Sequence, residues 1–550
     1  MISKNWIPDV ADQIEKHHAL YYRERSHIVC ASGISPSGPI HLGNLREIMT
    51  VHFVCDELRR RGWSVDHLHS WDDFDRLRKV PAGVPQTFAE NIGRPISEIP
   101  DPAGEYASYA DRHIHQFQES VAQLGIHPRY IRQTAMYRGG KYVPQIITAM
   151  DARLDIFDEL AKYQTKDEDD SALEGRRREY YPFRVYCEAC NRDTTVIHNY
   201  DPKTATITYQ CQTCSHTAEF SLHERVPGKL VWKVDWPMRW HYEGVEFEPG
   251  GEDHSSPGSS YTVGKSLVSL VYGGVAPYYI GYAFVGAAGR TKISSSVGTG
   301  IVPSVALRIL EPALMRWLYA RREYRQKFNI DFGQEVLRLY DEWDTLAKRS
   351  AQEGAAGLDI ETYKRSIATA DGPLQLTARP ISFRLLSSLA DVTLSNTEEM
   401  LRVLASDIEN APETPQLQAE LEPRLSCAIR WASEFLPEDE RTVINTSFRS
   451  DIYNSLSEDN RRGICLLLEQ LDQHWSLPGL TSLIYGVPKQ LLGLPLDTKP
   501  TDELKQTQRQ FFIALYRMLC SADTGPRLPT LFLALKQERV RALLMPPESE

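Results

Sequence analysis

The sequence predicts an α/β nucleotide-binding fold that is interrupted by a cysteine-bearing module and followed by a region made almost entirely of helices. Three observations lead to this fold class. Residues 27–71 read as strand, glycine-rich loop, helix and strand. Four of the nine cysteines form two close pairs between residues 187 and 214. From about residue 305 onwards the apolar spacing is helical.

The first strand is predicted over residues 27–33, where the apolar run HIVCASG leads into a Gly/Ser/Pro loop. A helix follows, with an apolar face made by Leu45, Ile48, Val51, Cys55 and Leu58. Gly62 ends this helix, and SVDHLHSW begins a second strand. This order of elements is typical of the start of a parallel α/β nucleotide-binding fold.

The loop SGISPSGPIHLGN favours phosphate binding. Gly33, Gly38 and Gly43 let the backbone approach a ligand without a Cβ. The next helix directs its free N–H groups at a phosphate, and His41 stands where that helix begins. The glycines form neither G-x-G-x-x-G nor a Walker loop, which disfavours a dehydrogenase or a P-loop ATPase. Taken alone, the loop could equally be a turn without a function.

A second loop, GAAGRTKISSSVGTG at 286–300, places Arg290 and Lys292 beside three serines, Ser294, Ser295 and Ser296. Cations and hydroxyls on a glycine-hinged segment suit the binding of a pyrophosphate leaving group. A Gly/Ser-rich loop by itself is more commonly a linker.

Acidic and aromatic residues alternate in three stretches between these loops: WDDFDRLRKVP (71–81), KVDWPMRW (233–240) and PGGEDHSSPGSSY (249–261). Carboxylates such as Asp235 and Asp253, next to aromatic faces, are what a substrate with an ammonium group needs. A solvated charge run or a core aromatic cluster explains each stretch equally well when it is taken alone.

The cysteine module is predicted from Cys187-x2-Cys190 and Cys211-x2-Cys214, with 20 residues between the pairs. This spacing is typical of a zinc ribbon with four cysteine ligands, and four protein ligands make the zinc structural. Two disulfides are the alternative. The other five cysteines lie in apolar surroundings, which indicates a reducing, cytoplasmic compartment. The charge-dense stretch 165–180 is predicted to be a linker, and the apolar α/β pattern resumes at about 231.

Composition excludes several classes of protein. The 550 residues are 42% hydrophobic and 25% charged, which is ordinary for a globular protein and not for a disordered or disulfide-scaffold chain. The net charge of −11 argues against a generally basic nucleic-acid coat, but local Lys/Arg patches can still bind phosphate. If nucleic acid binds, a basic track is expected along Arg176–Arg178 and the C-terminal helices.

No membrane span is predicted. Residues 266–289 are uncharged, but their glycines and Pro277 divide them into a helix end (266–272), a turn and a buried strand (278–285). The N-terminal residues carry Asp9, Asp12 and Glu15 without an apolar core, which is unlike a secretory signal.

Taken together, the two loops resemble the paired HIGH and KMSKS signatures of class I aminoacyl-tRNA synthetases. Here they read His41-Leu42-Gly43-Asn44 and Lys292-Ile293-Ser294-Ser295-Ser296, about 250 residues apart. With the 71–81 segment, the four cysteines, VDWPMRW, GGEDH and the C-terminal FFIALYRML, the string resembles the class I (archaeal-type) lysyl-tRNA synthetases over nearly the whole chain.

The resemblance implies a Rossmann-type catalytic domain in two halves (1–155 and 231–305) around an inserted zinc-binding module (156–230). A helical connecting region (306–365) and an all-α anticodon-binding domain (366–550) would follow. It further implies ATP-dependent activation of lysine and its transfer to tRNA-Lys. Mg²⁺ would act with ATP and Zn²⁺ would be structural, with no membrane and no obligate protein partner.

The resemblance also implies roles for individual residues. His41 and Lys292 would be catalytic. ATP would be bound by Pro36, Gly38, His41, Gly43, Asn44, Lys292, Ser294 and Ser295. Lysine would be bound by Gly33, Ser35, Trp232, His254 and Tyr282, with Tyr282 at the side-chain end. The metal ligands would be Cys187, Cys190, Cys211 and Cys214.

Three positions differ from the residues common in that family: Ala283 replaces an acidic residue, Glu252 a Lys and Thr262 an Asp. Two alternatives to a lysine enzyme therefore stay open. One is a class I synthetase for another amino acid, such as glutamate. The other is a relative that binds tRNA without aminoacylation.

Overall fold

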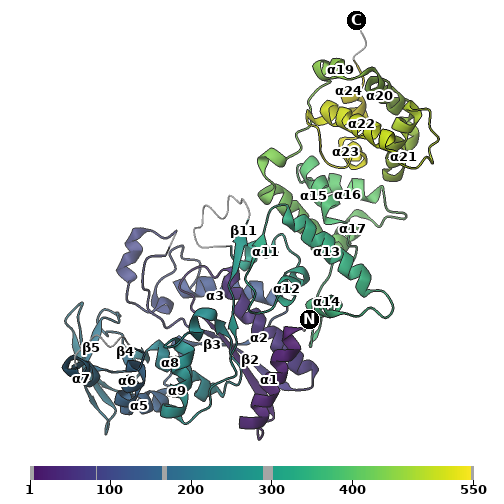
Figure 1. The fold of residues 1–550 in the computed structure, drawn as a ribbon. Helices are drawn as coiled ribbons and strands as arrows, with labels where there is room; N and C mark the ends of the chain where they lie inside the picture. Colours follow the sequence, from purple (N-terminus) through teal and green to yellow (C-terminus); the bar gives the residue numbers. More distant parts are fainter. Residues whose placement is uncertain (1–4, 82, 164–169, 289–300, 547–550) are drawn as a thin grey trace.

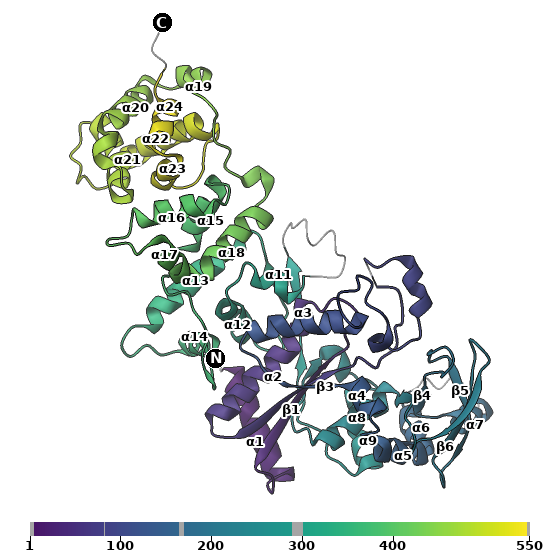
Figure 2. The same cartoon turned by 180° about the vertical axis from the view of Figure 1, so that it is seen from behind.

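The structure is a computed structural model, which describes residues 5–81, 83–163, 170–288 and 301–546. The α/β part and the C-terminal helices lie at opposite ends of an elongated molecule (Figures 1 and 2). The cysteine-bearing strands lie at the end of the α/β part that is far from the C-terminal helices. A ligand that contacts both ends must therefore be about as long as the molecule.

The predicted strand–loop–helix–strand unit is confirmed. Strand β1 (His27–Ile34) runs into a loop, helix α2 (Leu42–Arg60) and strand β2 (Ser64–Trp71). Gly62 ends the helix with a φ of +94°. Helix α3 (Tyr109–Gln123) then leads to β3 (Arg129–Arg132). The three strands are parallel in the order β1-β2-β3, so their carboxyl ends meet at one edge.

Single parallel bridges extend this sheet beyond β1, from Cys30 to Phe247 and from Phe247 to Tyr278. β1 is buried over nearly its whole length, which fits a central strand covered on both faces. Helix α1 (Trp6–Tyr21) packs against α2, which in turn packs on β1 and β2. Residues far apart in the sequence therefore meet at the carboxyl end of β1.

Short helices connect the sheet with the cysteine module. Two 3-10 turns, η1 (Gln86–Asn91) and η2 (Ile96–Glu98), lie in the long connection after β2. After β3 come α4 (Gln133–Arg138), α5 (Val143–Asp151) and α6 (Arg153–Ala161).

The predicted linker at 165–180 is wrong over its second part, because residues Asp170–Glu179 form helix α7. The sequence ALEGRRRE is rich in strong helix formers. Arg177 donates two hydrogen bonds, at 2.7 and 2.8 Å, to the carboxylate of Asp158 on α6, which docks the helix. Residues 164–169 lie outside the described residues.

The cysteine module is a small antiparallel structure. Strand β4 (Phe183–Val185) pairs with β8 (Gly228–Leu230), and β5 (Thr195–Asp201), β6 (Thr206–Cys211) and β7 (Thr217–Ser221) form a three-stranded sheet. β8 leads directly into α8 (Trp232–Glu243). The module therefore joins the α/β part through the helix that carries Trp232.

The segment after α8 is partly as predicted. The elements are β9 (Gly250–Gly251), η3 (Glu252–Ser255), α9 (Ser260–Tyr272), β10 (Gly281–Tyr282) and β11 (Val285–Ala288). The helix ends at Tyr272 as expected, with Gly273 at a φ of +64°. The single strand predicted over 278–285 is wrong: β10 pairs with β9, whereas β11 pairs with β12 (Phe328–Asp331), so the chain changes partner between them.

The helical region predicted from residue 305 is confirmed, apart from β12 and the short pair β13 (Ala368–Thr369) and β14 (Gly372–Pro373). Its helices near the sheet are α11 (Pro303–Leu307), α12 (Pro312–Ala320), α13 (Glu335–Ser350) and α14 (Leu358–Ile367). The C-terminal part consists of α15 (Phe383–Val392), α16 (Thr397–Ala405), α17 (Thr414–Leu421), α18 (Arg424–Arg430), η4 (Trp431–Phe435), η5 (Glu438–Glu440), α19 (Ser450–Ser455), α20 (Glu458–Gln470), η6 (Leu471–His474), α21 (Leu477–Leu491), α22 (Asp502–Cys520), α23 (Leu528–Leu535) and α24 (Gln537–Leu544).

A buried cluster of ion pairs ties the C-terminal part to α12 and α13. Arg424 on α18 donates to Glu311, just before α12, at 2.6 Å, and to Asp344 on α13 at 2.8 Å. Arg424 and Glu311 are almost fully buried. Among the described helices, none has the length and apolar character needed to cross a bilayer.

Candidate functional site

The loop after β1 holds His41 in a defined orientation. His41 is the N-cap of α2: its Nδ1 accepts a hydrogen bond from the Gly43 N–H at 3.0 Å, and the Asn44 side chain accepts one from the His41 N–H at 3.2 Å. Burial lowers the pKa of His41, which favours the neutral ring. Because Nδ1 is the acceptor, the ring proton is on Nε2, where it can be donated to a ligand.

Gly43 is required by this geometry. A Cβ at Gly43 would lie 2.8 Å from the His41 ring and 3.1 Å from the backbone oxygen of Val285. The glycine predicted for nucleotide binding thus acts by leaving room for His41 and β11.

A cavity of about 940 Å³ lies beside this loop. Of the residues predicted to bind ATP, Gly38, His41 and Asn44 line it, as does Ser35 from the predicted lysine set. Pro36 is buried, and neither it nor Gly43 is among the lining residues. The opposite wall is formed by residues 75–81, 83, 84 and 86. The remaining predicted ATP residues, Lys292, Ser294 and Ser295, and also Arg290 and Ser296, lie outside the described residues.

Glu47 on α2 is a candidate site residue that the sequence alone does not single out. Its Oε1 accepts a hydrogen bond from the Gly33 N–H at 2.6 Å, and its Oε2 accepts one from the Tyr282 hydroxyl at 2.7 Å. Two residues predicted to bind the same substrate, Gly33 and Tyr282, therefore meet on one carboxyl group. The available signal was position: Glu47 follows Asn44 by three residues, on the same face of α2.

Burial raises the pKa of Glu47 to about 8. Within the described residues no Lys, Arg or His forms an ion pair with this carboxyl group. A buried carboxylate without a cation is unfavourable, so this environment favours a ligand that brings a positive charge.

Trp232 and His254 come together through a third ring. Trp232 and Trp236 stack with centroids 5.3 Å apart, and His254 lies edge-on to Trp236 at 5.7 Å. Trp232 donates to the Ser260 hydroxyl at 3.1 Å. The β9–β10 pairing places Tyr282 opposite Gly251, just before the turn that carries His254. The structure thus joins Gly33 to Tyr282 through Glu47, and it joins Trp232 to His254 through Trp236.

The carboxylates of the 71–81 segment form ion pairs with other residues of the protein. Asp72 accepts from Arg239 at 2.5 Å, Asp73 from Arg132 at 2.8 Å, and Asp75 from Lys229 at 2.6 Å. Asp235, proposed from the second acidic and aromatic stretch, is buried and pairs with Arg239 and with Lys229. The expectation that these acids face an ammonium group is wrong for Asp72, Asp73, Asp75 and Asp235, because each of them already forms an ion pair with Arg239, Lys229 or Arg132 inside the protein.

The three unusual positions have structural roles. Glu252 accepts from Lys327 at 2.8 Å, and the Thr262 hydroxyl donates to the Ser256 carbonyl at 3.1 Å. Ala283 is fully buried, and its N–H donates to the Tyr324 carbonyl at 2.8 Å.

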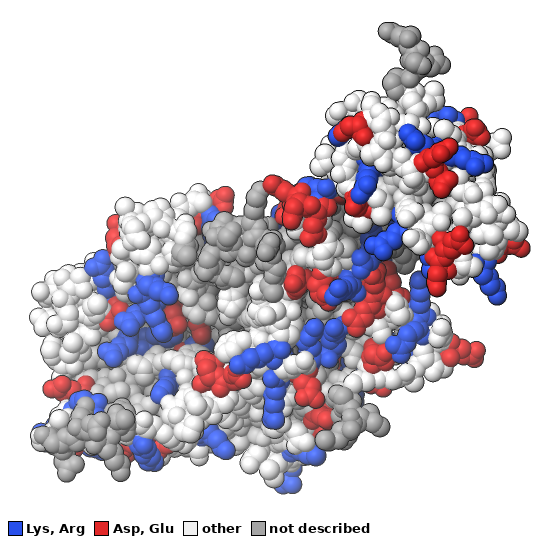
Figure 3. All heavy atoms as spheres, turned by 45° about the horizontal axis from the view of Figure 1, so that its top comes forward, with Lys and Arg blue, Asp and Glu red and all other residues white. Residues whose placement is uncertain are grey.

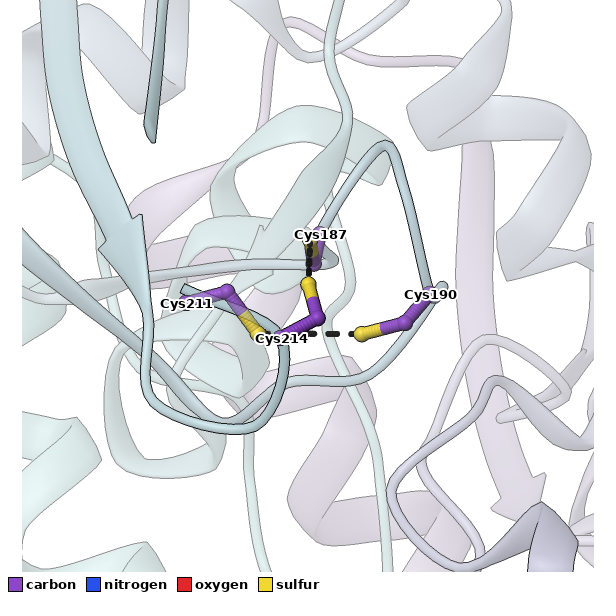
Figure 4. Close-up of side chains that lie close together, drawn as sticks. All are labelled: Cys187, Cys190, Cys211 and Cys214. Atoms are coloured by element: carbon purple, nitrogen blue, oxygen red, sulfur yellow. Dashed lines mark hydrogen bonds between the residues drawn. The ribbon is translucent and has the colours of Figure 1, made fainter. Parts of the chain in front are cut away.

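The four predicted metal ligands converge (Figure 4). The Sγ atoms of Cys187, Cys190, Cys211 and Cys214 all lie within 4.8 Å of one another, and this is the group of potential metal ligands found in the described part of the chain. The Sγ atoms of Cys187 and Cys214 are 3.6 Å apart, as are those of Cys190 and Cys211. In a disulfide the two Sγ atoms lie about 2.05 Å apart. Tetrahedral Zn–S bonds of about 2.3 Å give S–S separations of roughly 3.8 Å, so the residues fit zinc.

The segment that carries the first cysteine pair docks on the cavity wall. The Tyr186 hydroxyl donates to the Phe74 carbonyl at 2.6 Å, and Arg76 pairs with Asp193 at 2.7 Å. The Asp193 N–H donates to the Gly93 carbonyl at 2.9 Å. The cysteine module therefore supports the connection after β2 directly.

Surface charge is mixed where a basic track was expected. On the face shown in Figure 3, Lys and Arg gather in more than one place over the α/β part, with Asp and Glu beside them, and both signs alternate over the C-terminal helices. In the expected track, Arg177 pairs with Asp158 and Arg178 with Glu174, so their charges are partly neutralised.

Comparisons with known proteins identify a family whose sequences are similar to this chain. The sequence model of the family described as "tRNA synthetases class I (K)" matches residues 4–367. A protein named lysine–tRNA ligase from Streptomyces coelicolor is 44% identical, over 98% of each chain. Proteins of the same name from Pyrococcus horikoshii and Borrelia garinii are 33% and 30% identical, over 98% and 96% of each chain.

Proposed function

Because the chain belongs to the tRNA synthetases class I (K), we propose that it is a lysine–tRNA ligase. It activates lysine with ATP to lysyl-adenylate and transfers the lysyl group to the 3′ end of tRNA-Lys. The observation that carries the choice of lysine is the buried carboxyl group of Glu47 between the Gly33 N–H and the Tyr282 hydroxyl.

The side-chain ammonium group of lysine binds at Glu47. The two existing hydrogen bonds fix the carboxylate and leave lone pairs free on both oxygens. An ammonium group would neutralise the carboxylate and add a charge-assisted hydrogen bond, and it would draw the raised pKa of Glu47 downwards. Trp232, Trp236 and His254 supply an aromatic wall for the rest of the substrate.

Glutamate, which Ala283 suggested as an alternative substrate, is not favoured. The side chain of a glutamate substrate would place its carboxyl group next to that of Glu47, and the two like charges would repel each other. The cations Arg239 and Lys229 are already bound to aspartates. The acidic group that the Ala283 position lacks is supplied by Glu47. A tRNA-binding relative without activity is disfavoured by the intact His41 cap and by the buried carboxyl group of Glu47.

In the activation step, the lysine carboxylate attacks the α-phosphorus of ATP, and the bond to pyrophosphate breaks. No side-chain nucleophile is needed, because the substrate supplies one. His41 donates its Nε2 proton as a hydrogen bond to the phosphate oxygens as charge develops there, and the N-terminus of α2 adds its dipole. Lys292 and Ser294 are proposed from the sequence to stabilise the leaving pyrophosphate. When Mg²⁺ is bound with ATP, it would supply further charge neutralisation at the phosphates.

The lysyl group then passes to a terminal ribose hydroxyl of tRNA-Lys, and AMP leaves. The cysteine ligands Cys187, Cys190, Cys211 and Cys214 would hold one structural Zn²⁺ and keep the module folded against the cavity wall. We further propose that residues 366–550 bind the tRNA anticodon region, since helices α19–α24 of this range lie at the far end of the elongated molecule. The reducing cytoplasm suits such thiolate ligands.

Amino-acid-dependent ATP–pyrophosphate exchange across the twenty amino acids, with and without tRNA, tests the proposal. Lysine should be the amino acid that supports exchange. Exchange with glutamate would favour the first alternative, and no exchange with any amino acid despite tRNA binding would favour the second.

A further inference from the structure

The cavity beside the nucleotide loop is large for one ligand. Its volume of about 940 Å³ lies near the top of the range of roughly 300–1,000 Å³ for small-molecule sites. Ser35, residues 37–41 and Asn44 form one wall, and residues 75–81, 83, 84 and 86 form the other. The second wall has no assigned function.

The second wall carries two cationic side chains that have no partner in the described part of the protein. Its Asp75 is bound to Lys229 and its Arg76 to Asp193. Arg78 and Lys79 also line the cavity, both are exposed, and neither has a hydrogen-bond or ion-pair partner within the described residues. Two adjacent free cations at a cavity wall favour an anionic ligand.

Contacts with the cysteine module hold this wall in position. The bonds of Tyr186 to Phe74 and of Asp193 to Arg76 flank the start of the wall. Gly93, beyond its end, accepts from the Asp193 N–H. These contacts hold the chain segment that carries the two cations against the cysteine module.

We propose that Arg78 and Lys79 bind phosphates of the tRNA 3′ end as it enters the cavity opposite His41. The inference rests on the proposed function, because it needs a second substrate at the nucleotide loop. The phosphates of ATP are served by the N-terminus of α2 on the first wall. A polymer that brings its terminal hydroxyl into the cavity must leave its preceding phosphates at the rim, where these exposed cations lie.

The test compares tRNA-Lys with tRNA-Lys that lacks its three 3′-terminal nucleotides, using the full-length protein and filter binding at several salt concentrations. The variant is the double substitution Arg78→Gln/Lys79→Gln. The matched control is Lys16→Gln/Lys141→Gln, which removes the same charge from exposed lysines outside the cavity lining.

The variant should bind intact tRNA about tenfold more weakly than the wild type, with a salt slope reduced by roughly 1.4 for two single-strand contacts. It should bind truncated tRNA as the wild type does, and the KM for ATP at saturating tRNA should not change. Equal weakening with both tRNAs, no weakening, or a raised KM for ATP would each overturn the inference. If the wild type does not charge tRNA with lysine at all, it is the proposed function that fails.

Discussion

The Tyr282 hydroxyl donates a hydrogen bond to Glu47 Oε2 at 2.7 Å, across 235 residues of sequence. This bond joins β10 to the second turn of α2 and sets the carboxyl group at the carboxyl end of β1. The substitution Glu47→Gln keeps the size of the side chain and removes its charge. The KM for lysine should rise by about 10- to 100-fold, the effect of losing a hydrogen bond to a charged group, with little change in the KM for ATP.

ATP–pyrophosphate exchange kinetics check this prediction. Tyr282→Phe is the companion variant, and it should have a smaller effect because the carboxylate remains. An unchanged KM for lysine in Glu47→Gln would remove Glu47 from the substrate site.

The activity should depend on pH through the same group. Burial raises the pKa of Glu47 to about 8, so below that pH the carboxyl group of the free enzyme is mainly protonated. Lysine needs the ionised form. The value of kcat/KM for lysine, which reports the free enzyme, should therefore rise as the pH increases and level off above about 8. Glu47→Gln should lack this step, and a variant that retained it would show that another group titrates.

The cysteine cluster should hold metal. Metal analysis of the purified protein should give about one zinc per chain. Cys187→Ser should lower zinc content and Tm together, because zinc binding contributes to folding of the module. Cys465→Ser, which changes an exposed cysteine outside the cluster, should change neither. Zinc-free wild-type protein of unchanged Tm would contradict the metal site.

Gly93 tests the contact between the cysteine module and the cavity wall. It has a φ of +89°, and an added Cβ would lie 3.3 Å from Arg192 and Asp193. Gly104 has a φ of +70° with open space around it. Gly104→Ala should cost about 1–2 kcal/mol for the left-handed backbone alone. Gly93→Ala should lower the Tm further and raise the KM for tRNA. Equal Tm values for the two variants would show that the contact at Gly93 does not contribute to stability.

Local patterns are sufficient to predict the local parts of the structure. The strands at 27–34 and 64–71, helix α2 and the cysteine cluster follow from periodicity and spacing within short stretches. The linker predicted at 165–180 is wrong because its charges indicate solvation, while Arg177 has a specific partner in Asp158 on α6.

Long-range pairing is not predictable in the same way. Asp72 and Asp75 could have faced a substrate, and only the fold shows that they pair with Arg239 and Lys229, which are 167 and 154 residues away. Conversely, Glu47 resembles a surface residue of an amphipathic helix until the fold brings Tyr282 to it. The recognition of the substrate charge therefore depends on a carboxylate that has no motif of its own.

The charging of tRNA-Lys with lysine and with glutamate, by the wild-type protein and by Glu47→Gln, tests the central claim most directly. The wild type should form lysyl-tRNA and not glutamyl-tRNA. Glu47→Gln should lose lysyl-tRNA formation at low lysine concentration and recover it at high concentration. Charging with glutamate, or charging with lysine that is indifferent to the loss of Glu47, would contradict the assignment of this site.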